Sequence, residues 1–121
     1  MLIRIFELIN PFKQETMNSI SVSELKEMMD NNEDFHLIDV REAHEYEAAN
    51  INATLIPLSE IAGRHGEFPK DKKVIVHCRS GKRSADAIAF LSQNLGYTNL
   101  VNLEGGIMAW ARDIDNSLEV N

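Results

Sequence analysis

Short apolar runs alternate with helix-like stretches along most of the chain, and this alternation limits the fold more than any other feature. The apolar runs have the length and composition of buried strands, and the stretches between them contain good helix formers. The expected strands cover residues 35–40, 53–58, 72–78 and 99–103. The expected helices cover residues 23–32, 41–49, 58–66, 82–96 and 105–114. This order predicts an α/β fold with a central, mainly parallel β-sheet and helices on both faces.

The composition is that of one globular domain. The chain has 121 residues, of which 44% are hydrophobic and 26% charged, enough for a single hydrophobic core. It contains one cysteine, which excludes an internal disulfide framework and a cysteine-based structural zinc site. A lone cysteine is compatible with a reducing compartment, and we expect a cytoplasmic protein.

The first residues, MLIRIFELINPF, are apolar, but Arg4 and Glu7 interrupt the run and Pro11 ends it. A membrane-spanning helix needs about 20 residues, and the features of a secretory signal peptide are missing. We therefore expect no transmembrane segment. We expect instead an N-terminal extension, residues 1–19, that packs on the domain. Residues 116–121 are expected to form a frayed C-terminal tail.

The charge is unevenly distributed. The net charge of −7 argues against nonspecific nucleic-acid binding. Residues 64–84 hold seven of the twelve Lys and Arg residues and only two acidic ones, so this segment is locally +5 and the remainder −12. Most of the lysines in the segment fit a solvated surface, whereas Arg79, Lys82 and Arg83 surround the only thiol.

That thiol lies in the stretch VIVHCRSGKRS, between an apolar strand and the next helix. Cys78 follows the carboxyl end of the strand, where open α/β sheets bind their ligands. Gly81 permits a turn that directs several N–H groups to one point, and the positive end of the helix dipole faces the same point. Such surroundings lower the pKa of a thiol and produce a nucleophilic thiolate.

The alternative for Cys78 is a buried, inert thiol, as for most lone cysteines. A structural cysteine should have apolar neighbours on both sides. Cys78 has them on one side only, and three cationic residues fall within the next five positions. The asymmetry favours a reactive thiol.

The spacing within the loop separates two classes of thiol enzyme. Protein-tyrosine phosphatases place five residues between their cysteine and an arginine. Here four residues separate Cys78 from Arg83, and Ser84 occupies the position of the phosphatase arginine. A shorter loop surrounds a smaller group, so a phosphatase or an arsenate reductase is a weaker alternative.

The loop HCRSGKRS resembles the active-site loop of the rhodanese family, sulfurtransferases that carry sulfur on a cysteine persulfide. LIDVREAHEYEAANI, residues 37–51, resembles the first signature of the family, and LEGGIMAW, residues 103–110, resembles its C-terminal signature. One departure is Ala49-Asn50, which replaces the usual Gly-His and predicts a local change of turn. The resemblance is strongest to the single rhodanese domains fused to molybdopterin- and thiamine-type adenylyltransferases, and it implies a rhodanese-like domain over residues 20–115.

The resemblance implies a thiosulfate sulfurtransferase. Cys78 would attack the outer sulfur of thiosulfate or a similar small anionic donor, and cyanide, a thiol or a sulfur-carrier protein would accept the sulfur. It implies no metal and no organic cofactor, because the carried group is sulfur itself. The residues expected to bind the substrate and the persulfide are Arg79, Ser80, Gly81, Lys82, Arg83, Arg41 and Asp39.

Several roles stay open at this level. Arg41 and Asp39 form either part of the substrate rim or a structural ion pair. His77 is expected to bond the backbone and not to act as a base, and Ser84 to bond the loop or cap the helix. As a whole, the chain is either an enzyme or a persulfide carrier that works only with a protein partner. A regulatory domain without activity is disfavoured, because such domains often lack the cysteine.

Overall fold

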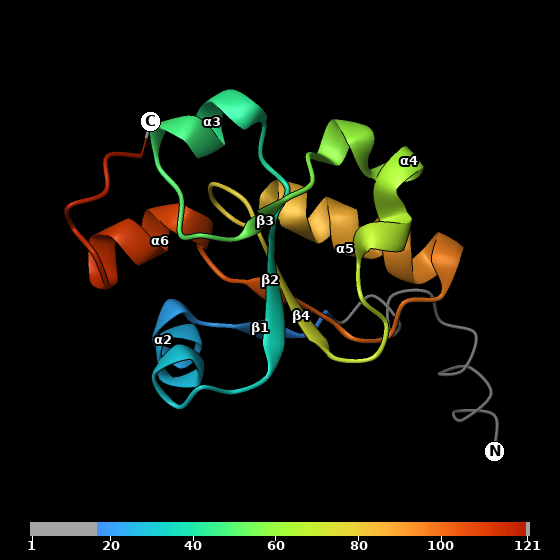
Figure 1. Ribbon diagram of the computed structural model, residues 1–121, viewed down its shortest axis with the longest axis horizontal. Coiled ribbons are helices and arrows are strands. Elements are labelled where there is room, and N and C mark those ends of the chain that lie inside the picture. Colours follow the sequence, from blue (N-terminus) through green and yellow to red (C-terminus); the bar gives the residue numbers. More distant parts are fainter. Residues whose placement is uncertain (1–16, 121) are drawn as a thin grey trace, which may run out of the picture.

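The computed structural model describes residues 17–120, which fold around a five-stranded, entirely parallel sheet in the order β1-β5-β4-β2-β3 (Figure 1). The strands are β1 (Ser19–Ile20), β2 (Phe35–Asp39), β3 (Thr54–Leu55), β4 (Lys73–His77) and β5 (Leu100–Leu103). The helices are α2 (Val22–Asp30), α3 (Ala43–Ala48), α4 (Ile61–Arg64), α5 (Lys82–Leu95) and α6 (Gly106–Asp113). The predicted α/β fold with a parallel sheet is confirmed. Most of the predicted N-terminal extension lies outside the described residues.

Helices cover both faces of the sheet, as a parallel sheet requires. In Figure 1, α2 and α6 lie on one side of the sheet, and α4 and α5 lie on the other. Alternate residues of β4 enter two different cores: Val74 and Val76 pack on the α5 side, whereas Ile75 packs on the side of α2 and α6. All three side chains are fully buried, so β4 is the centre of the domain.

The register brings the ends of the strands to one edge of the sheet. Asp39 at the end of β2 pairs with His77 at the end of β4, and Val76 pairs with Asn102 of β5. Because the strands are parallel, the segments that follow β2, β4 and β5 emerge at the same edge. The loop after β4 therefore lies between the segments that follow its two neighbours.

The helix expected over residues 58–66 differs from the prediction. It is divided into a 3₁₀ turn at Leu58–Glu60, the single α-helical turn α4 and a second 3₁₀ turn at His65–Glu67. Two glycines, Gly63 and Gly66, fall in the nine predicted positions, and glycine weakens a helix interior by about 1 kcal/mol.

The start of α2 has a clear sequence signal, whereas the strand β1 has none. Ser21 caps α2 through a capping box with Glu24. By contrast, β1 has only two residues and no strand-like pattern. Its pairing depends on β5, where Asn102 donates its N–H to the Asn18 carbonyl.

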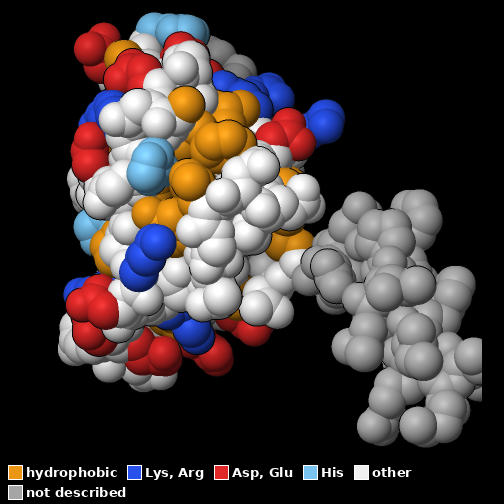
Figure 2. Space-filling model, turned by 90° about the vertical axis from the view of Figure 1, so that its right-hand side faces the viewer, with side chains coloured by type: hydrophobic (Ala, Val, Ile, Leu, Met, Phe, Trp, Pro, Cys, Tyr) orange, Lys and Arg blue, Asp and Glu red, His pale blue; other side chains and the backbone are white. Residues whose placement is uncertain are grey.

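The surface is mixed in character. Figure 2 shows the side on which α4 and the C-terminal end of α5 lie, and hydrophobic side chains form a patch there among charged and histidine side chains. Within the part of the chain that the structure describes, no helix has the length and hydrophobicity needed to cross a membrane.

Candidate active site

The segment between β4 and α5 forms a tight loop around the sulfur of Cys78. The N–H of Gly81 donates to Sγ at 3.1 Å, and the N–H of Ser84, in the first turn of α5, donates at 3.4 Å. Gly81 has φ of +105°, a conformation that side chains rarely adopt, and this turns its N–H back toward the sulfur. Cys78 is only 1% exposed, so the sulfur lies at the centre of the loop and not on its rim.

The first turn of α6 holds the same loop from behind. The N–H of Ile107 donates to the Cys78 carbonyl at 2.9 Å, and the N–H of Met108 donates to the Arg79 carbonyl at 3.1 Å. Carbonyl groups at the start of the loop therefore point to the positive end of α6. With those carbonyls turned away, N–H groups are left to face the sulfur.

This close approach requires glycine at the start of α6. A Cβ atom on Gly106 would overlap the Cys78 carbonyl oxygen and come within 2.6 Å of the Arg79 carbonyl oxygen. Its φ of +57° also disfavours other residues. Gly106 of the C-terminal signature is thus required for the contact with the cysteine loop.

The loop lowers the pKa of Cys78. Burial alone would raise the pKa, but the contacts of Ser84, Gly81 and Ser80 with the sulfur outweigh burial. From the sequence we expected main-chain donors and cationic side chains to act together. The largest contributions that lower this pKa come from Ser84, Gly81 and Ser80, and the charges of Arg83 and Cys78 also attract each other.

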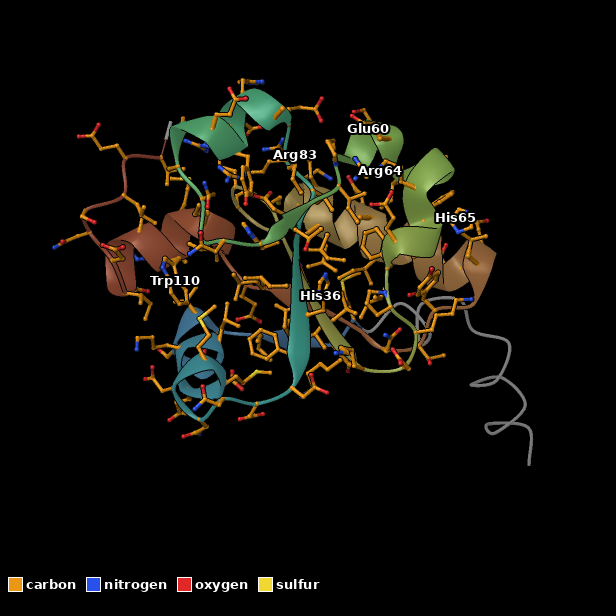
Figure 3. The ribbon with its side chains drawn as sticks, viewed as in Figure 1. His36, Glu60, Arg64, His65, Arg83 and Trp110 are labelled. Carbon is orange, nitrogen blue, oxygen red and sulfur yellow. The ribbon has the colours of Figure 1, made fainter. Side chains whose placement is uncertain are left out.

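The cationic residues of the loop lie in different environments. Arg83 makes two hydrogen bonds with the carboxylate of Glu45 on α3, at 2.7 and 2.8 Å, and Figure 3 shows it between α3 and the start of α5. Lys82 is 85% exposed, with Asp86 4.0 Å away. Arg79 is half-buried beside the cysteine. Arg83 is therefore engaged with a carboxylate, whereas Lys82 extends into solvent.

Glu45 was not singled out from the sequence. It lies 38 positions before Arg83, and only the fold, which brings Glu45 of α3 to the start of α5, reveals the pair. The Arg83 hydrogen bonds, opposed by burial, lower the pKa of Glu45 to about 2, so this carboxylate is charged at neutral pH.

Asp39 and Arg41 form a bidentate ion pair inside the protein. Arg41 Nε and Nη2 donate to the Asp39 carboxylate at 2.8 to 3.1 Å, and Nη2 also donates to the Ala49 carbonyl at 2.7 Å. Asp39 is 0% and Arg41 2% exposed. The structure therefore places this pair beneath the surface, where it ties the end of β2 to the segment after α3.

His77 lies beside this pair and is fully buried. Its Nδ1 is 3.2 Å from the Cys78 carbonyl, and its Nε2 is 3.6 Å from Asp39 Oδ2 and has no hydrogen-bond partner. Burial lowers its pKa, only partly opposed by the Asp39 charge, so the imidazole is neutral at pH 7. A carbonyl only accepts, so Nδ1 carries the proton and His77 bonds the backbone.

Ala49-Asn50, which stands where the family usually has Gly-His, begins an ordered turn. Asn50 donates from its side chain to the Tyr46 carbonyl at 3.0 Å and accepts from the N–H of Asn52 at 2.9 Å. Asn52 has φ of +64°, a conformation that asparagine tolerates. In this turn the Ala49 carbonyl accepts from Arg41, so the segment after α3 is also tied to the end of β2.

The side chains of Ser84 and Asn102, which we did not include among the predicted binding residues, also belong to the site. Ser84 Oγ lies 3.4 Å from Cys78 Sγ, and Asn102 of β5 contacts both Ser84 and Gly81. Ser84 was expected to bond the loop, whereas Asn102 was not considered. A polar residue within an otherwise apolar strand was the available signal. Among the described residues, no group of His, Cys, Asp and Glu side chains could hold a metal ion.

The fold and the loop define an α/β protein with one ionisable thiol at the carboxyl edge of a parallel sheet. Residues 21–113 match the family described as Rhodanese-like domain, and the chain belongs to that family. A protein of Allochromatium vinosum named sulfurtransferase is 41% identical over 97 residues, which are 79% of this chain and 90% of that protein. Sulfur transfer is therefore the chemistry of the family.

Two further relatives show how widely such domains are used. The crystal structure of a rhodanese-like domain protein from Staphylococcus aureus has a TM-score of 0.73 and 35% identity, and covers 87% of this chain and 99% of that one. A Mycobacterium tuberculosis protein named probable adenylyltransferase/sulfurtransferase MoeZ is 36% identical over 100 residues, which are 80% of this chain but only 25% of MoeZ. The same type of domain thus stands alone in one protein and is part of a larger one in another.

Proposed function

We propose that this protein transfers sulfur from thiosulfate, or a similar small anionic donor, to a thiophilic acceptor through a persulfide on Cys78. The observation that carries the proposal is the ring of N–H groups around a single thiol, with Gly81 N 3.1 Å and Ser84 N 3.4 Å from Sγ. Such a ring stabilises a thiolate, which is the nucleophile in sulfur transfer.

The reaction proceeds in two balanced steps. The Cys78 thiolate attacks the outer sulfur of thiosulfate, the S–S bond of thiosulfate breaks, and sulfite leaves with the electron pair. The anionic persulfide that remains then gives its outer sulfur to the acceptor, which restores the Cys78 thiolate. No oxidant or reductant is consumed, and no metal or organic cofactor takes part.

The main chain of the loop is the proposed binding site for the outer sulfur. In this proposal the N–H groups from Arg79 to Arg83 bind the outer sulfur, and the positive end of α5 adds to the attraction for an anion. Because Cys78 is almost fully buried, only a small donor reaches Sγ.

Side chains have more distant roles in this proposal. Lys82, on the exposed side of the loop, attracts the donor from solvent, together with Arg79. Arg83 and the buried pair of Asp39 and Arg41 hold the elements that frame the loop. A cytoplasmic location is part of the proposal, because the mechanism needs a reduced thiol.

Intact-mass measurement tests the reaction directly. After treatment with thiosulfate, the protein should gain the mass of one sulfur atom, and cyanide should remove it. Cys78→Ser should gain nothing, since the chain has no second cysteine. An unchanged mass in the wild-type protein would remove thiosulfate as a donor, and a gain in Cys78→Ser would remove Cys78 as the carrier.

A second candidate is a persulfide carrier that receives or delivers sulfur only with a protein partner. The occurrence of a similar domain within MoeZ favours this possibility. Turnover of thiosulfate and cyanide separates the two functions. Repeated turnover supports the free enzyme, whereas persulfide formation without turnover supports the carrier.

A further inference from the structure

The hydroxyl of Ser84 lies between two groups that compete for its single proton. Its Oγ is 3.4 Å from Cys78 Sγ and 2.6 Å from Oδ1 of Asn102. A serine hydroxyl has one O–H to donate and two lone pairs to accept. It can therefore donate to the sulfur or to Asn102, but not to both.

The orientation of the Asn102 amide decides between them. The other end of this amide faces the Gly81 carbonyl, and Nδ2 donates to that oxygen at 3.1 Å. A carbonyl oxygen only accepts, so the amide cannot be reversed without losing this bond and placing two oxygens together. Oδ1 therefore faces Ser84 and accepts its proton over the shorter of the two distances.

We propose that Asn102 is a positioning residue that withholds the Ser84 hydroxyl proton from the sulfur of Cys78. With its proton on Asn102, Ser84 Oγ presents a lone pair to the sulfur and accepts from the S–H of the protonated thiol. The hydroxyl thus stabilises the thiol, whereas the N–H groups of Gly81 and Ser84 stabilise the thiolate. In this arrangement the main chain, and not the hydroxyl, ionises Cys78.

The arrangement deepens the proposed function, on which this step rests. In the persulfide the negative charge moves to the outer sulfur, so Sγ no longer gains from an O–H donor. Asn102 therefore disfavours the empty thiolate while leaving the loaded form unaffected. The effect is to shift the balance of the site toward the persulfide.

A double-mutant cycle on Ser84 and Asn102 tests this assignment. The pKa of Cys78 is measured from the pH dependence of its alkylation by iodoacetamide, in the wild-type protein, Ser84→Ala, Asn102→Leu and the double variant. With Asn102 present, Ser84→Ala should leave the pKa unchanged or slightly lower, because the hydroxyl does not donate to the thiolate. In Asn102→Leu the Ser84 hydroxyl is free to donate to the sulfur. The double variant should therefore have a Cys78 pKa about one unit higher than that of Asn102→Leu.

The cycle separates the effect of the Ser84 hydroxyl proton on the pKa of Cys78 from the effect of a change in loop structure. Asn102→Leu also removes the bond to Gly81, but this loss is common to both arms and cancels in the difference. If Ser84→Ala raises the pKa equally with and without Asn102, the hydroxyl already donates to the thiolate and the assignment is overturned. If Asn102→Leu does not fold, the Ser84→Ala arm alone decides, because a rise of about one unit there also overturns it.

The control is Asn99→Leu, which removes a side-chain amide that bonds the Pro69 and Lys72 carbonyls, away from the cysteine. It should not alter the effect of Ser84→Ala. The charged and titratable groups around the cysteine loop, His77 on β4, Arg79 in the loop, and Lys82 and Arg83 on α5, are unchanged in every variant. Alkylation needs no sulfur donor, so the result stands whether or not thiosulfate proves to be a substrate.

Discussion

The reactivity of Cys78 depends on a balance between its burial and the donors around its sulfur. Burial raises its pKa, and the contacts from Ser84, Gly81 and Ser80 lower it further than burial raises it. Alkylation by iodoacetamide should therefore reach half of its maximal rate below the pH of about 8.5 typical of a free thiol. In the urea-unfolded protein the midpoint should return to that value, and a folded midpoint at or above it contradicts the ring of donors.

The same lowered pKa has a consequence for stability. The folded state binds the Cys78 proton more weakly than the unfolded state does. The thiolate therefore contributes stability above the unfolded pKa, and this contribution is lost as the pH falls through the folded pKa. Cys78→Ser should remove this part of the pH dependence when the free energy of unfolding is measured from about 2.5 pH units below the free-thiol value to about half a unit above it.

At the scale of residues, the sequence was informative about the cysteine and less so about its neighbours. An apolar run on one side and a glycine on the other were enough to predict a loop of N–H donors around Cys78. The partners of Arg83 and Ser84 were not predictable, because Glu45 and Asn102 reach the loop from other elements. Side-chain pairs between distant segments leave no local pattern.

The contact between α6 and the cysteine loop leads to a prediction for Gly106. In Gly106→Ala the new methyl group would meet the Cys78 and Arg79 carbonyls, so the first turn of α6 must move away. We expect a loss of about 2 kcal/mol or more in the free energy of unfolding, as for other overpacked or strained sites. The pKa of Cys78 should rise as well, because the loop loses its support.

Gly63→Ala is the matched control for Gly106→Ala. No atom lies within 4 Å of the position where its Cβ would stand, and Gly63 is in the helical turn α4. Alanine should be neutral or slightly stabilising there. Urea unfolding of both variants makes the comparison, and equal effects would mean that the close approach at Gly106 is unimportant.

The ion pair between Glu45 and Arg83 links α3 to α5 and predicts a dependence on pH. The Arg83 hydrogen bonds, against the effect of burial, lower the pKa of Glu45 from 4.5 to about 2 in the folded protein. The pair therefore contributes stability above pH 4.5, and the contribution is lost as the pH falls toward 2. Glu45→Gln should reduce the free energy of unfolding at pH 7 by about 0.5–1 kcal/mol, since the pair is partly exposed to solvent.

Glu60→Gln is the control for this pair. Glu60 also bonds an arginine, Arg64, but on the exposed surface of the domain (Figure 3). Its replacement should have a smaller effect than that of Glu45 at pH 7. Below pH 3 the difference in the free energy of unfolding between Glu45→Gln and the wild-type protein should shrink. A difference that stays constant with pH excludes the ionised pair as its cause.

At the scale of elements, periodicity predicted every strand of more than two residues and the long helix α5. Those elements have an apolar stripe or run of their own, and the pattern is local. The division of the helix after β3 was harder to predict from the sequence, because its short turns are held by contacts such as that between the Tyr97 hydroxyl and the His65 carbonyl. The edge strand β1 exists only through its pairing with β5.

At the scale of the whole molecule, the buried pair of Asp39 and Arg41 should be the most sensitive polar contact. Asp39→Asn keeps the shape of the side chain but leaves the Arg41 guanidinium buried without its charged partner. Removing one partner of a buried ion pair costs about 3–5 kcal/mol. Urea unfolding at pH 7 should show a loss of this size.

Asp34→Asn provides the comparison for Asp39→Asn. Asp34 pairs with Lys72 in a solvent-exposed position, where ion pairs contribute little. Its replacement should change the free energy of unfolding by less than about 1 kcal/mol. If both variants lose the same free energy of unfolding, burial of the pair of Asp39 and Arg41 does not determine its contribution to stability.

The support of the cysteine loop by α6 also bears on when the thiol becomes reactive. Ile107 and Met108, whose N–H groups hold the Cys78 and Arg79 carbonyls, follow the cysteine by almost thirty positions. A ribosome releases these residues after the loop itself. A nascent chain that still lacks them carries an ordinary thiol, so the sulfur becomes activated only after the first turn of α6 has been made.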